Sequence, residues 1–276
     1  MPALLKRVLG LSGSSPRVVA LLTDFGARDQ YVAVVKGVLL TRNPRLTLVD
    51  ISHDVTPQGI GQAAYLLWAA YRYLPPGTVF LVVVDPGVGT DRPILIVRTD
   101  RYTFVAPDNG VLDMVMSEES RVECFQGTEG SLRWLSPGPV SRTFHGRDVF
   151  APVAAELSRG VPPEQLGVRV AVPSVVNPFV DGSTGRATAQ ILHIDRFGTV
   201  ITNVRVTSAT ADGRPREVRI GRRTLSRWVD TYADAPADAP VLMVGSSGLL
   251  EIAVRNGSAA ETLHVAPGMS LTVSRA

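Results

Sequence analysis

The chain has 276 residues, 45% of them hydrophobic, which is enough apolar material for one large domain or two smaller ones. Its 28 basic and 25 acidic residues leave a net charge of only +3, a balance too mild to indicate a nucleic acid or another polyanion as a partner. The single cysteine, Cys124, excludes an intrachain disulfide framework and a cysteine-based metal cluster.

Residues 1–16 hold Lys6 and Arg7 beside short apolar pieces, without the long hydrophobic core or the small-residue cleavage site of a signal peptide. We interpret them as a flexible N-terminal extension. No apolar run in the chain reaches membrane-spanning length. We therefore expect a cytoplasmic protein without a membrane partner.

Strand-like apolar runs alternate with helical patterns from residue 17 to about residue 160. The expected strands are 18–22, 46–51, 79–84, 94–98 and 103–106, the last two forming a hairpin, and the expected helices are 31–41, 61–74 and 148–159. Such alternation is typical of a parallel-rich sheet flanked by helices. We predict an α/β fold whose N-terminal domain spans residues 17–160.

A proline-rich segment at residues 161–185 is interpreted as an ordered linker. Short strand-like runs separated by glycine and aspartate turns follow it, at residues 187–194, 200–202, 217–220, 241–244, 249–254 and 271–274. They predict a smaller C-terminal β domain at residues 186–276, built from antiparallel strands. Arginines gather at 214–227, but Val218 and Ile220 alternate with Arg219 there, which favours a half-exposed strand over a nucleic-acid site.

Two acidic residues directly follow two of the predicted buried strands. Asp85 follows the run 79–84 on a tight Pro-Gly-Val-Gly turn that leads to Arg92, and Asp24 follows the run 18–22. In open α/β sheets, ligands collect outside the carboxyl ends of the strands, so we expect the two acids to share one crevice. For Asp24 alone, a turn or a helix cap is an equally good interpretation.

A third candidate loop, Phe144-His145-Gly146-Arg147-Asp148, opens a predicted helix. His145 is a candidate general base, or a group that orients one. The ordinary alternative is a solvent-facing histidine in front of a helix. Asp148 is expected in the first turn of that helix, with Arg147 paired to a nearby acid.

Two loops of the C-terminal domain carry further candidates. In the first, Asp195 is suited to accept a ribose hydroxyl and Phe197 to stack on an aromatic ring, with an ordinary β-turn as the alternative. In the second, a Gly-Ser-Ser-Gly stretch at 245–248 precedes Glu251 and Arg255. Its backbone N–H groups and these side chains could bind a charged small molecule, and a hairpin connection is the alternative.

The remaining patterns are weaker. His53 lies in a strand-end loop in which Asp54 and Pro57 already account for a turn. No spacing of histidines or carboxylates predicts a metal site. The chain also lacks the dinucleotide-binding, phosphate-binding and nucleophile-elbow motifs. The residues by themselves predict a small-molecule α/β enzyme without specifying its reaction.

Six short motifs nevertheless occur in a recognisable order: Thr23-Asp24-Phe25-Gly26, Asp85-Pro86-Gly87-Val88-Gly89, Pro107-Asp108-Asn109-Gly110, Phe144-His145-Gly146-Arg147-Asp148, Asp195-Arg196-Phe197-Gly198 and Gly248-Leu249-Leu250-Glu251-Ile252-Ala253. Together they resemble the S-adenosylmethionine (SAM) hydroxide adenosyltransferases, adenosine-forming SAM hydrolases related to the SAM-dependent fluorinase and chlorinase. The resemblance covers residues 17–276.

This resemblance implies attack of water or hydroxide on the 5′ carbon of the SAM ribose, giving adenosine and L-methionine. It implies homotrimers in which each site lies between the N-terminal domain of one subunit and the C-terminal domain of its neighbour. The family's set for water activation corresponds to Asp85, Arg92 and His145, and its ribose-binding acid corresponds to Asp24. The positions that correspond to contacts with the adenine or methionine portion are Asp195, Phe197, Ser246, Glu251, Val254 and Arg255.

One position departs from the family pattern. Thr199 stands where many relatives carry an asparagine whose amide bonds the adenine edge, and the shorter threonine puts this contact in doubt. Asn203, four residues further on, offers a substitute.

The sulfonium of SAM is already a good leaving group, so neither a cofactor nor a metal is expected, and SAM itself is the substrate. The enzyme then has to align water, C5′ and sulfur and to desolvate the nucleophile partly. Asp85 is suited to accept a water proton beside Arg92, and the sequence leaves open whether Asp85 or His145 takes it.

Two alternative functions stay open. A SAM-dependent halogenase is disfavoured because the fluorinase and chlorinase carry tyrosine where this chain has Asp85, whose negative charge would repel a halide. The fluorinase also inserts a loop for which residues 98–107 leave no room. The second alternative is a non-catalytic sensor of SAM or adenosine, in which Asp85, Arg92 and His145 are only structural polar groups.

Overall fold

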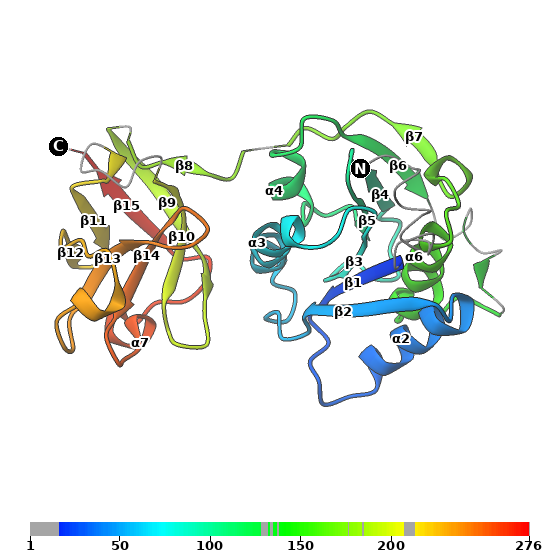
Figure 1. Cartoon of the computed structure of the whole chain (residues 1–276), viewed down its shortest axis with the longest axis horizontal. Coiled ribbons are helices and arrows are strands. Elements are labelled where there is room, and N and C mark those ends of the chain that lie inside the picture. Colours follow the sequence, from blue (N-terminus) through cyan, green and yellow to red (C-terminus); the bar gives the residue numbers. More distant parts are fainter. Residues whose placement is uncertain are drawn as a thin grey trace, which may run out of the picture. The chain divides into compact units, whose positions relative to one another are not determined.

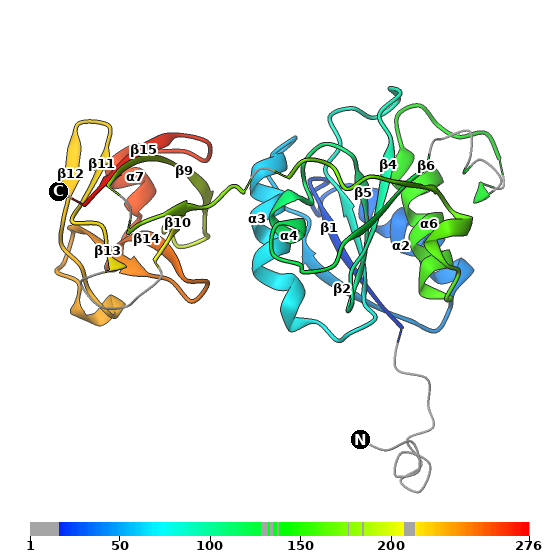
Figure 2. The same cartoon turned by 90° about the horizontal axis from the view of Figure 1, so that it is seen from above.

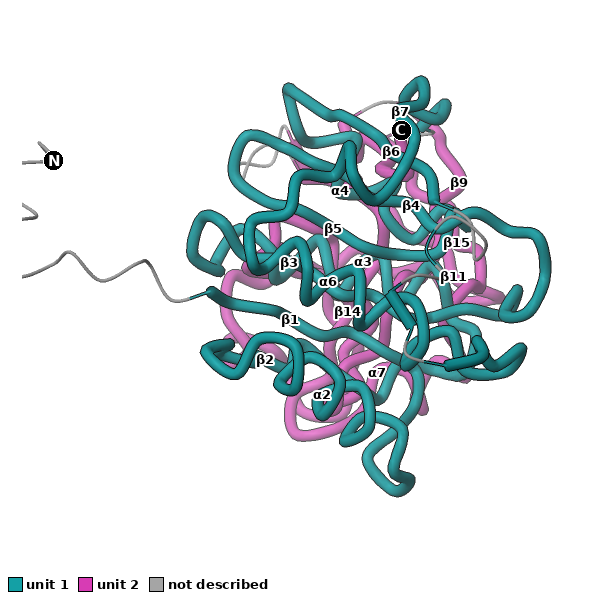
Figure 3. The backbone as a smooth tube through the Cα atoms, turned by 90° about the vertical axis from the view of Figure 1, so that its right-hand side faces the viewer, with its two compact units in different colours: residues 1–176 teal, residues 177–276 magenta. Residues whose placement is uncertain are grey.

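The structure, a computed structural model, describes residues 17–127, 132, 135–136, 138–175, 177–183, 185–206 and 213–275. The chain divides into two compact units between residues 176 and 177 (Figure 3). The extension predicted at residues 1–16 lies outside the described residues. The predicted α/β fold is confirmed, with a mixed sheet and helices in unit 1 and mainly antiparallel strands in unit 2.

A seven-stranded sheet forms the centre of unit 1, in the order β2-β1-β3-β5-β4-β6-β7 (Figure 1). Its strands are β1 (Arg17–Thr23), β2 (Leu46–Ser52), β3 (Val79–Val83), β4 (Ile94–Arg98), β5 (Thr103–Pro107), β6 (Glu123–Gly127) and β7 (Val168–Val170). β2, β1, β3 and β5 run parallel, and β4, β6 and β7 pair antiparallel with their neighbours. The acidic loops follow strands of the parallel half.

Helices cover both faces of this sheet (Figure 2). On one face lie α2 (Tyr31–Arg42) and α6 (Ala151–Ser158), and on the other lie α3 (Ile60–Ala70) and α4 (Asp113–Met116). A short 3-10 helix, η1 (Tyr71–Tyr73), continues α3, and a π-helical turn, η3 (Gly146–Phe150), leads into α6.

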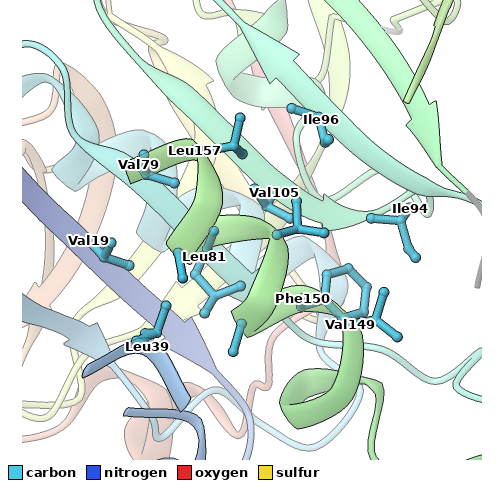
Figure 4. Close-up of a cluster of buried hydrophobic side chains, with 14 of the residues drawn as sticks. Val19, Leu39, Val79, Leu81, Ile94, Ile96, Val105, Val149, Phe150 and Leu157 are labelled. Atoms are coloured by element: carbon cyan, nitrogen blue, oxygen red, sulfur yellow. The ribbon is translucent and has the colours of Figure 1, made fainter. Parts of the chain in front are cut away.

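The central strand β3 is buried on both faces, as its continuous apolar sequence predicts. On one face Leu81 packs in the core with Leu39 of α2 and Phe150 of η3 (Figure 4). On the opposite face Phe80 stacks on Phe104 of β5, with ring centroids 4.8 Å apart. Full burial of each such side chain stabilises the fold by about 1.5–3 kcal/mol, so the strand that ends at the Asp85 loop is firmly held.

Unit 2 is a nearly closed sheet in the order β12-β11-β15-β9-β10-β14-β13, with β8 added parallel to β10. Its strands are β8 (Val180–Asp181), β9 (Arg186–Ile194), β10 (Val200–Arg205), β11 (Glu217–Ile220), β12 (Arg223–Leu225), β13 (Pro240–Val244), β14 (Leu249–Val254) and β15 (Ser270–Ser274). A bridge between Trp228 and Leu242 connects the chain after β12 to β13 at the other end of the sheet. The short helices η6 (Tyr232–Asp234) and α7 (Ala259–Leu263) complete the unit.

The segment 161–185, interpreted from the sequence as a linker, contributes to both sheets. It holds the 3-10 helix η4 (Pro163–Gln165), then β7, which pairs with β6, and then β8, which pairs with β10. Across the described part of the chain, no helix is both long enough and apolar enough to span a membrane.

Candidate active site

Asp24 and Asp85 leave the sheet of unit 1 at the same edge. β1 and β3 run parallel, and Thr23 at the end of β1 pairs with Val83 at the end of β3. The loops that follow these two strands therefore start from adjacent points, outside the carboxyl ends where α/β sheets bind ligands.

A bidentate ion pair joins Asp85 to Arg92. Arg92 donates from Nε to Oδ1 at 2.7 Å and from Nη2 to Oδ2. Only 5% of the Asp85 side chain and 11% of the Arg92 side chain are exposed, and the guanidinium lies over the ring of Phe150, 4.9 Å from its centroid. Such a fork fixes the direction of the carboxylate and leaves a second lone pair on each oxygen for a water molecule.

His145 contacts the same guanidinium. Its side chain is buried, and its Nδ1 lies 3.2 Å from Nη2 of Arg92. Because a guanidinium only donates hydrogen bonds, Nδ1 accepts, which assigns the ring proton to Nε2 in this arrangement. Asp85, Arg92 and His145, which the family resemblance groups together, thus form one hydrogen-bonded cluster.

Two glycines shape the loops that carry this cluster. Gly89 has φ +77°, and a Cβ at this position would overlap the carbonyl group of Arg142. A Cβ at Gly146 would lie 3.2 Å from ring atoms of both Phe25 and Phe144. Glycine is required at Gly89, where a side chain would push the loop away from Arg142, and at Gly146 a side chain would crowd the two phenylalanine rings.

Asp24 is held by a backbone group of another loop. Its Oδ2 accepts a hydrogen bond from the N–H of Gln58 at 2.8 Å. Gln58 has φ +64°, a conformation that costs a residue with a side chain about 1–2 kcal/mol. Asp24 does not cap α2, whose N-cap is Gln30. This leaves the Asp24 carboxylate oriented by the Gln58 loop.

Arg147 and Asp148 stabilise the loop in front of η3. Arg147 donates from Nε to Oδ1 of Asp148 at 2.7 Å, and the N–H of Ser141 donates to Oδ2 at 2.8 Å. Burial raises the pKa of Asp148, but these hydrogen bonds together bring it below its usual value. The pair therefore orders the chain that leads to His145.

Unit 2 contains a pocket of about 780 Å³, a volume typical of sites for small organic ligands. The residues that line it are Asp195, Phe197, Thr199, Tyr232, Ala233, Val254, Arg255, Asn256 and Gly257. The structure thus brings together five of the positions selected from the sequence, which are Asp195, Phe197, Thr199, Val254 and Arg255.

The turn after β9 is organised by Asp195. Its Oδ1 accepts hydrogen bonds from the backbone N–H groups of Phe197 at 2.9 Å and Thr199 at 2.8 Å. Gly198 in this turn has φ +82°. The ring of Phe197 is 79% exposed and lines the pocket. The residues 195–199 therefore form an ordinary turn and also line a pocket that could bind a ligand.

Tyr232 lines the same pocket and was missed in the sequence. Its hydroxyl donates a hydrogen bond to Oε2 of Glu251 at 3.5 Å. Its position in η6 follows from a capping box formed by Thr231 and Asp234, a sequence signal that could have indicated an ordered aromatic residue at this point.

Glu251 is a buried carboxyl beside this pocket. Burial, followed by the charge of Asp195, raises the pKa of Glu251. A Cβ at Gly245 would overlap its carboxylate, so the present position of this carboxylate depends on the glycine. A buried acid next to a second acid favours a ligand that brings a hydrogen-bond donor or a positive charge.

Two candidate positions lie outside the lining of the pocket. Ser246 is exposed in the turn between β13 and β14. The amide of Asn203 donates to the carbonyl of Pro178 at 2.7 Å and accepts from the N–H of Gln190 at 2.8 Å. Asn203 therefore holds backbone segments together, and the suggestion that it replaces the adenine contact of the family asparagine is not supported.

Within the described ranges, no three histidine, cysteine, aspartate or glutamate side chains gather where they could hold a metal ion. The cluster described above supplies a carboxylate, a guanidinium and an imidazole.

Comparison with protein families accounts for nearly the whole chain. Residues 19–167 match the family described as SAM hydroxide adenosyltransferase N-terminal domain, and residues 189–272 match its C-terminal domain. The chain belongs to the SAM hydroxide adenosyltransferase family. The resemblance seen in the motifs is confirmed.

Individual relatives agree with this membership. The chain is 42% identical over 260 residues to a protein of Thermus thermophilus named (R)-S-adenosyl-L-methionine hydrolase, covering 92% of this chain and 98% of the relative. It is 27% identical to a fluorinase of an Actinoplanes species, covering 94% and 98% of the two chains. The crystal structure of an uncharacterized conserved protein from Thermotoga maritima matches with a TM-score of 0.82 at 36% identity, covering 93% of this chain and all of that chain.

Proposed function

We propose that this protein hydrolyses SAM to adenosine and L-methionine. The observation that carries the proposal is the partly buried cluster of Asp85, Arg92 and His145 at the carboxyl edge of the sheet, in a chain 42% identical to a named (R)-SAM hydrolase. The name of that relative specifies the (R) configuration at sulfur, and we propose the same epimer as the substrate here.

The proposed reaction is a nucleophilic substitution at carbon. The oxygen of a water molecule forms a bond to C5′ of the ribose while the bond between C5′ and sulfur breaks. The electron pair of the broken bond stays on sulfur, which turns the sulfonium into the neutral thioether of methionine. One proton leaves the attacking water, so the products are adenosine, L-methionine and a proton.

Asp85 is the proposed acceptor of that proton. Its carboxylate keeps one lone pair on each oxygen outside the fork with Arg92. The imidazole of His145 uses Nδ1 to accept from Arg92 and carries its proton on Nε2, so it has no free lone pair in this arrangement. We assign His145 the task of holding Arg92, and through it Asp85, in position.

The cluster contributes mainly through geometry. Attack at C5′ requires water, carbon and sulfur in line, and correct placement of reacting groups supplies a large share of rate acceleration in such steps. The side chains of Asp85 and Arg92 are mostly shielded from solvent, so a water bound to them would be only partly solvated, which increases its reactivity.

The substrate contacts in the proposal follow the family correspondence. Asp24 would hold the ribose hydroxyls. The adenine and methionine portions would contact Asp195, Phe197, Thr199, Ser246, Glu251, Val254 and Arg255, most of which line or adjoin the pocket of unit 2. Phe197 and Tyr232 supply exposed aromatic surface for a purine ring.

The assembly and setting are part of the same proposal. We propose a homotrimer in which unit 1 of one subunit and unit 2 of its neighbour complete each site, with no cofactor. Cyclic symmetry allows such head-to-tail contacts to repeat and close. The proposed location is the cytoplasm, in keeping with a single buried cysteine, Cys124.

A halogenase is the second candidate, because fluorinases are among the relatives. The structure argues against it, since the charge of Arg92 is already matched by Asp85 through two hydrogen bonds. A halide would find no net positive charge there and would be repelled by the carboxylate.

The test is incubation of the pure protein with (R)-SAM, followed by chromatography of the products. We expect adenosine and methionine at a rate that fluoride and chloride leave unchanged. Release of methylthioadenosine or S-adenosylhomocysteine without adenosine would refute the hydrolase. A 5′-halogenated 5′-deoxyadenosine would identify a halogenase, and adenosine binding with only background turnover would identify a sensor.

A further inference from the structure

His53, the residue after β2, contacts the loop that carries Asp24 at two points. Its ring atom Nδ1 lies 2.8 Å from Oγ1 of Thr23, and its carbonyl accepts a hydrogen bond from the N–H of Gly26 at 2.7 Å. β1 and β2 lie side by side in the sheet (Figure 3), so the ends of both strands belong to one edge.

An irregularity in the pairing of β1 with β2 brings this contact about. Leu21 pairs with Asp50, whereas Leu22 pairs with Ser52, so β2 contains one extra residue at this point. Such bulges redirect side chains and are frequent beside active sites. Here the bulge places the residue that follows β2 level with the end of β1.

The ring of His53 lies between Thr23 and Asp50. Its Nε2 lies 3.0 Å from Oδ1 of Asp50, and Oδ2 of Asp50 accepts from Nζ of Lys36 at 2.6 Å. The Thr23 hydroxyl, which is fully buried, also accepts from the N–H of Phe25 at 3.3 Å.

The hydrogen bond between Nδ1 of His53 and Oγ1 of Thr23 is the contact that links this histidine to the Asp24 loop. The direction of the buried hydroxyl is then fixed from outside the loop. Because the N–H of Phe25 donates to this hydroxyl, the backbone that follows Asp24 is fixed as well.

We propose that His53 is a positioning residue for Asp24, holding the loop of residues 23–26 so that the Asp24 carboxylate points in one direction. The inference rests on the proposed function, because binding of the ribose by Asp24 is part of it. The N–H of Gln58, from the same segment, holds the carboxylate itself. His53 acts through Thr23 and the backbone, so its loss is expected to weaken nucleoside binding more than it slows the chemical step.

Two pairs of substitutions isolate the contact. His53→Ala removes both ring contacts, whereas His53→Asn offers an acceptor near the place of Nδ1 and keeps the bond to Thr23. Thr23→Val removes the hydroxyl at nearly constant shape, and Thr23→Ser keeps it. His264→Asn is the matched control, since His264 is exposed in unit 2 with φ +55°, a conformation that asparagine tolerates.

The measurements are KM and kcat for (R)-SAM and the dissociation constant of adenosine by calorimetry, on the full-length protein. Loss of one or two hydrogen bonds corresponds to roughly a tenfold change. We expect His53→Ala and Thr23→Val to raise KM and the adenosine dissociation constant by about tenfold and to change kcat less than about threefold. His53→Asn, Thr23→Ser and His264→Asn should stay within about threefold of the wild type.

The proposal would be overturned if both His53→Ala and Thr23→Val bound adenosine with the dissociation constant of the wild type. It would also be overturned if His53→Asn lost as much adenosine affinity as His53→Ala. If His53→Ala does not fold, the comparison of Thr23→Val with Thr23→Ser tests the proposal. A wild type that binds adenosine without hydrolysing SAM would refute the hydrolase and leave the comparison of binding constants valid. A wild type that neither binds adenosine nor hydrolyses SAM would refute both.

Discussion

Arg92 holds Asp85 by both carboxylate oxygens, with Nε 2.7 Å from Oδ1, where only 5% of the aspartate side chain is exposed. The charges of Arg92 and Asp85 compensate each other, so the pair exerts only a weak net electrostatic field on a substrate. What it provides is a carboxylate with a fixed direction and free lone pairs. Because His145 accepts from the same guanidinium at 3.2 Å, displacing one member displaces the others.

Replacing Asp85 by asparagine should lower kcat by roughly 10²–10⁴-fold, the usual loss for a positioned acid–base group. The amide keeps the shape of the side chain but cannot accept a proton from water. The adenosine dissociation constant should change little, since Asp24 and the pocket of unit 2 would still bind the nucleoside. Asp91→Asn, the same change at an exposed position of the same loop, is the control. Normal hydrolysis by Asp85→Asn would exclude its proposed role.

Replacing Arg92 by lysine keeps the positive charge and removes the fork. A lysine ammonium cannot donate to both oxygens of Asp85 and to His145 in the present geometry. We expect kcat to fall by about 10²-fold, the cost of a misplacement of about 1 Å. Steady-state kinetics would show it, with Arg121→Lys, whose side chain is 69% exposed, as the control. An unchanged kcat in Arg92→Lys would mean that charge alone suffices.

Glu251 should make the stability of unit 2 depend on pH. Burial and then the charge of Asp195 raise its pKa from the usual 4.5. Above pH 4.5 the folded state therefore keeps a proton that the unfolded chain releases. The stability due to this group is complete below pH 4.5 and falls as the pH rises from 4.5 through the raised pKa.

Glu251→Gln lacks this penalty, because its amide resembles the protonated acid. Thermal unfolding followed by circular dichroism should give the variant a higher Tm than the wild type at neutral pH, with the difference disappearing in mild acid. SAM affinity should fall in the same variant. A lower Tm for Glu251→Gln by the same amount at both pH values would contradict the expected ionisation penalty.

Mixing two inactive variants tests whether a site is shared between subunits. Asp24→Ala spoils unit 1 and Glu251→Ala spoils unit 2. After subunit exchange in an equal mixture, about a quarter of the interfaces of a cyclic trimer would pair two intact halves. Light scattering should show the trimer, and the mixture should regain activity that neither variant has alone. Activity in a monomer, or no recovery after demonstrated exchange, would rule out the shared site.

The strands of the sheet were largely predictable, because burial on both faces leaves continuous apolar runs in the sequence. The run expected at 79–84 is β3 (Val79–Val83), and the hairpin expected at 94–106 is β4 with β5. β7 (Val168–Val170) carries no such signal, since two of its three residues are exposed and only pairing with β6 makes it a strand.

The site was predictable where function depends on residues at strand ends and not where tertiary contacts create it. Asp85, Arg92 and His145 could be grouped only through the family resemblance, because 53 residues separate Arg92 from His145. Tyr232 reaches the pocket through the position of η6, and the capping box of Thr231 and Asp234 indicates an ordered turn there but not a pocket. Asn203 has the chemistry of a ligand-binding amide, yet its backbone hydrogen bonds give it a structural task.

The most direct test of the account is hydrolysis of (R)-SAM in water enriched with heavy oxygen, with the products analysed by mass spectrometry. Attack of water on C5′ predicts one heavy oxygen in the 5′ hydroxyl of adenosine and none in methionine, at a rate that fluoride does not change. Adenosine without the label, or a labelled amino-acid product together with methylthioadenosine, would contradict the proposed attack at the ribose carbon.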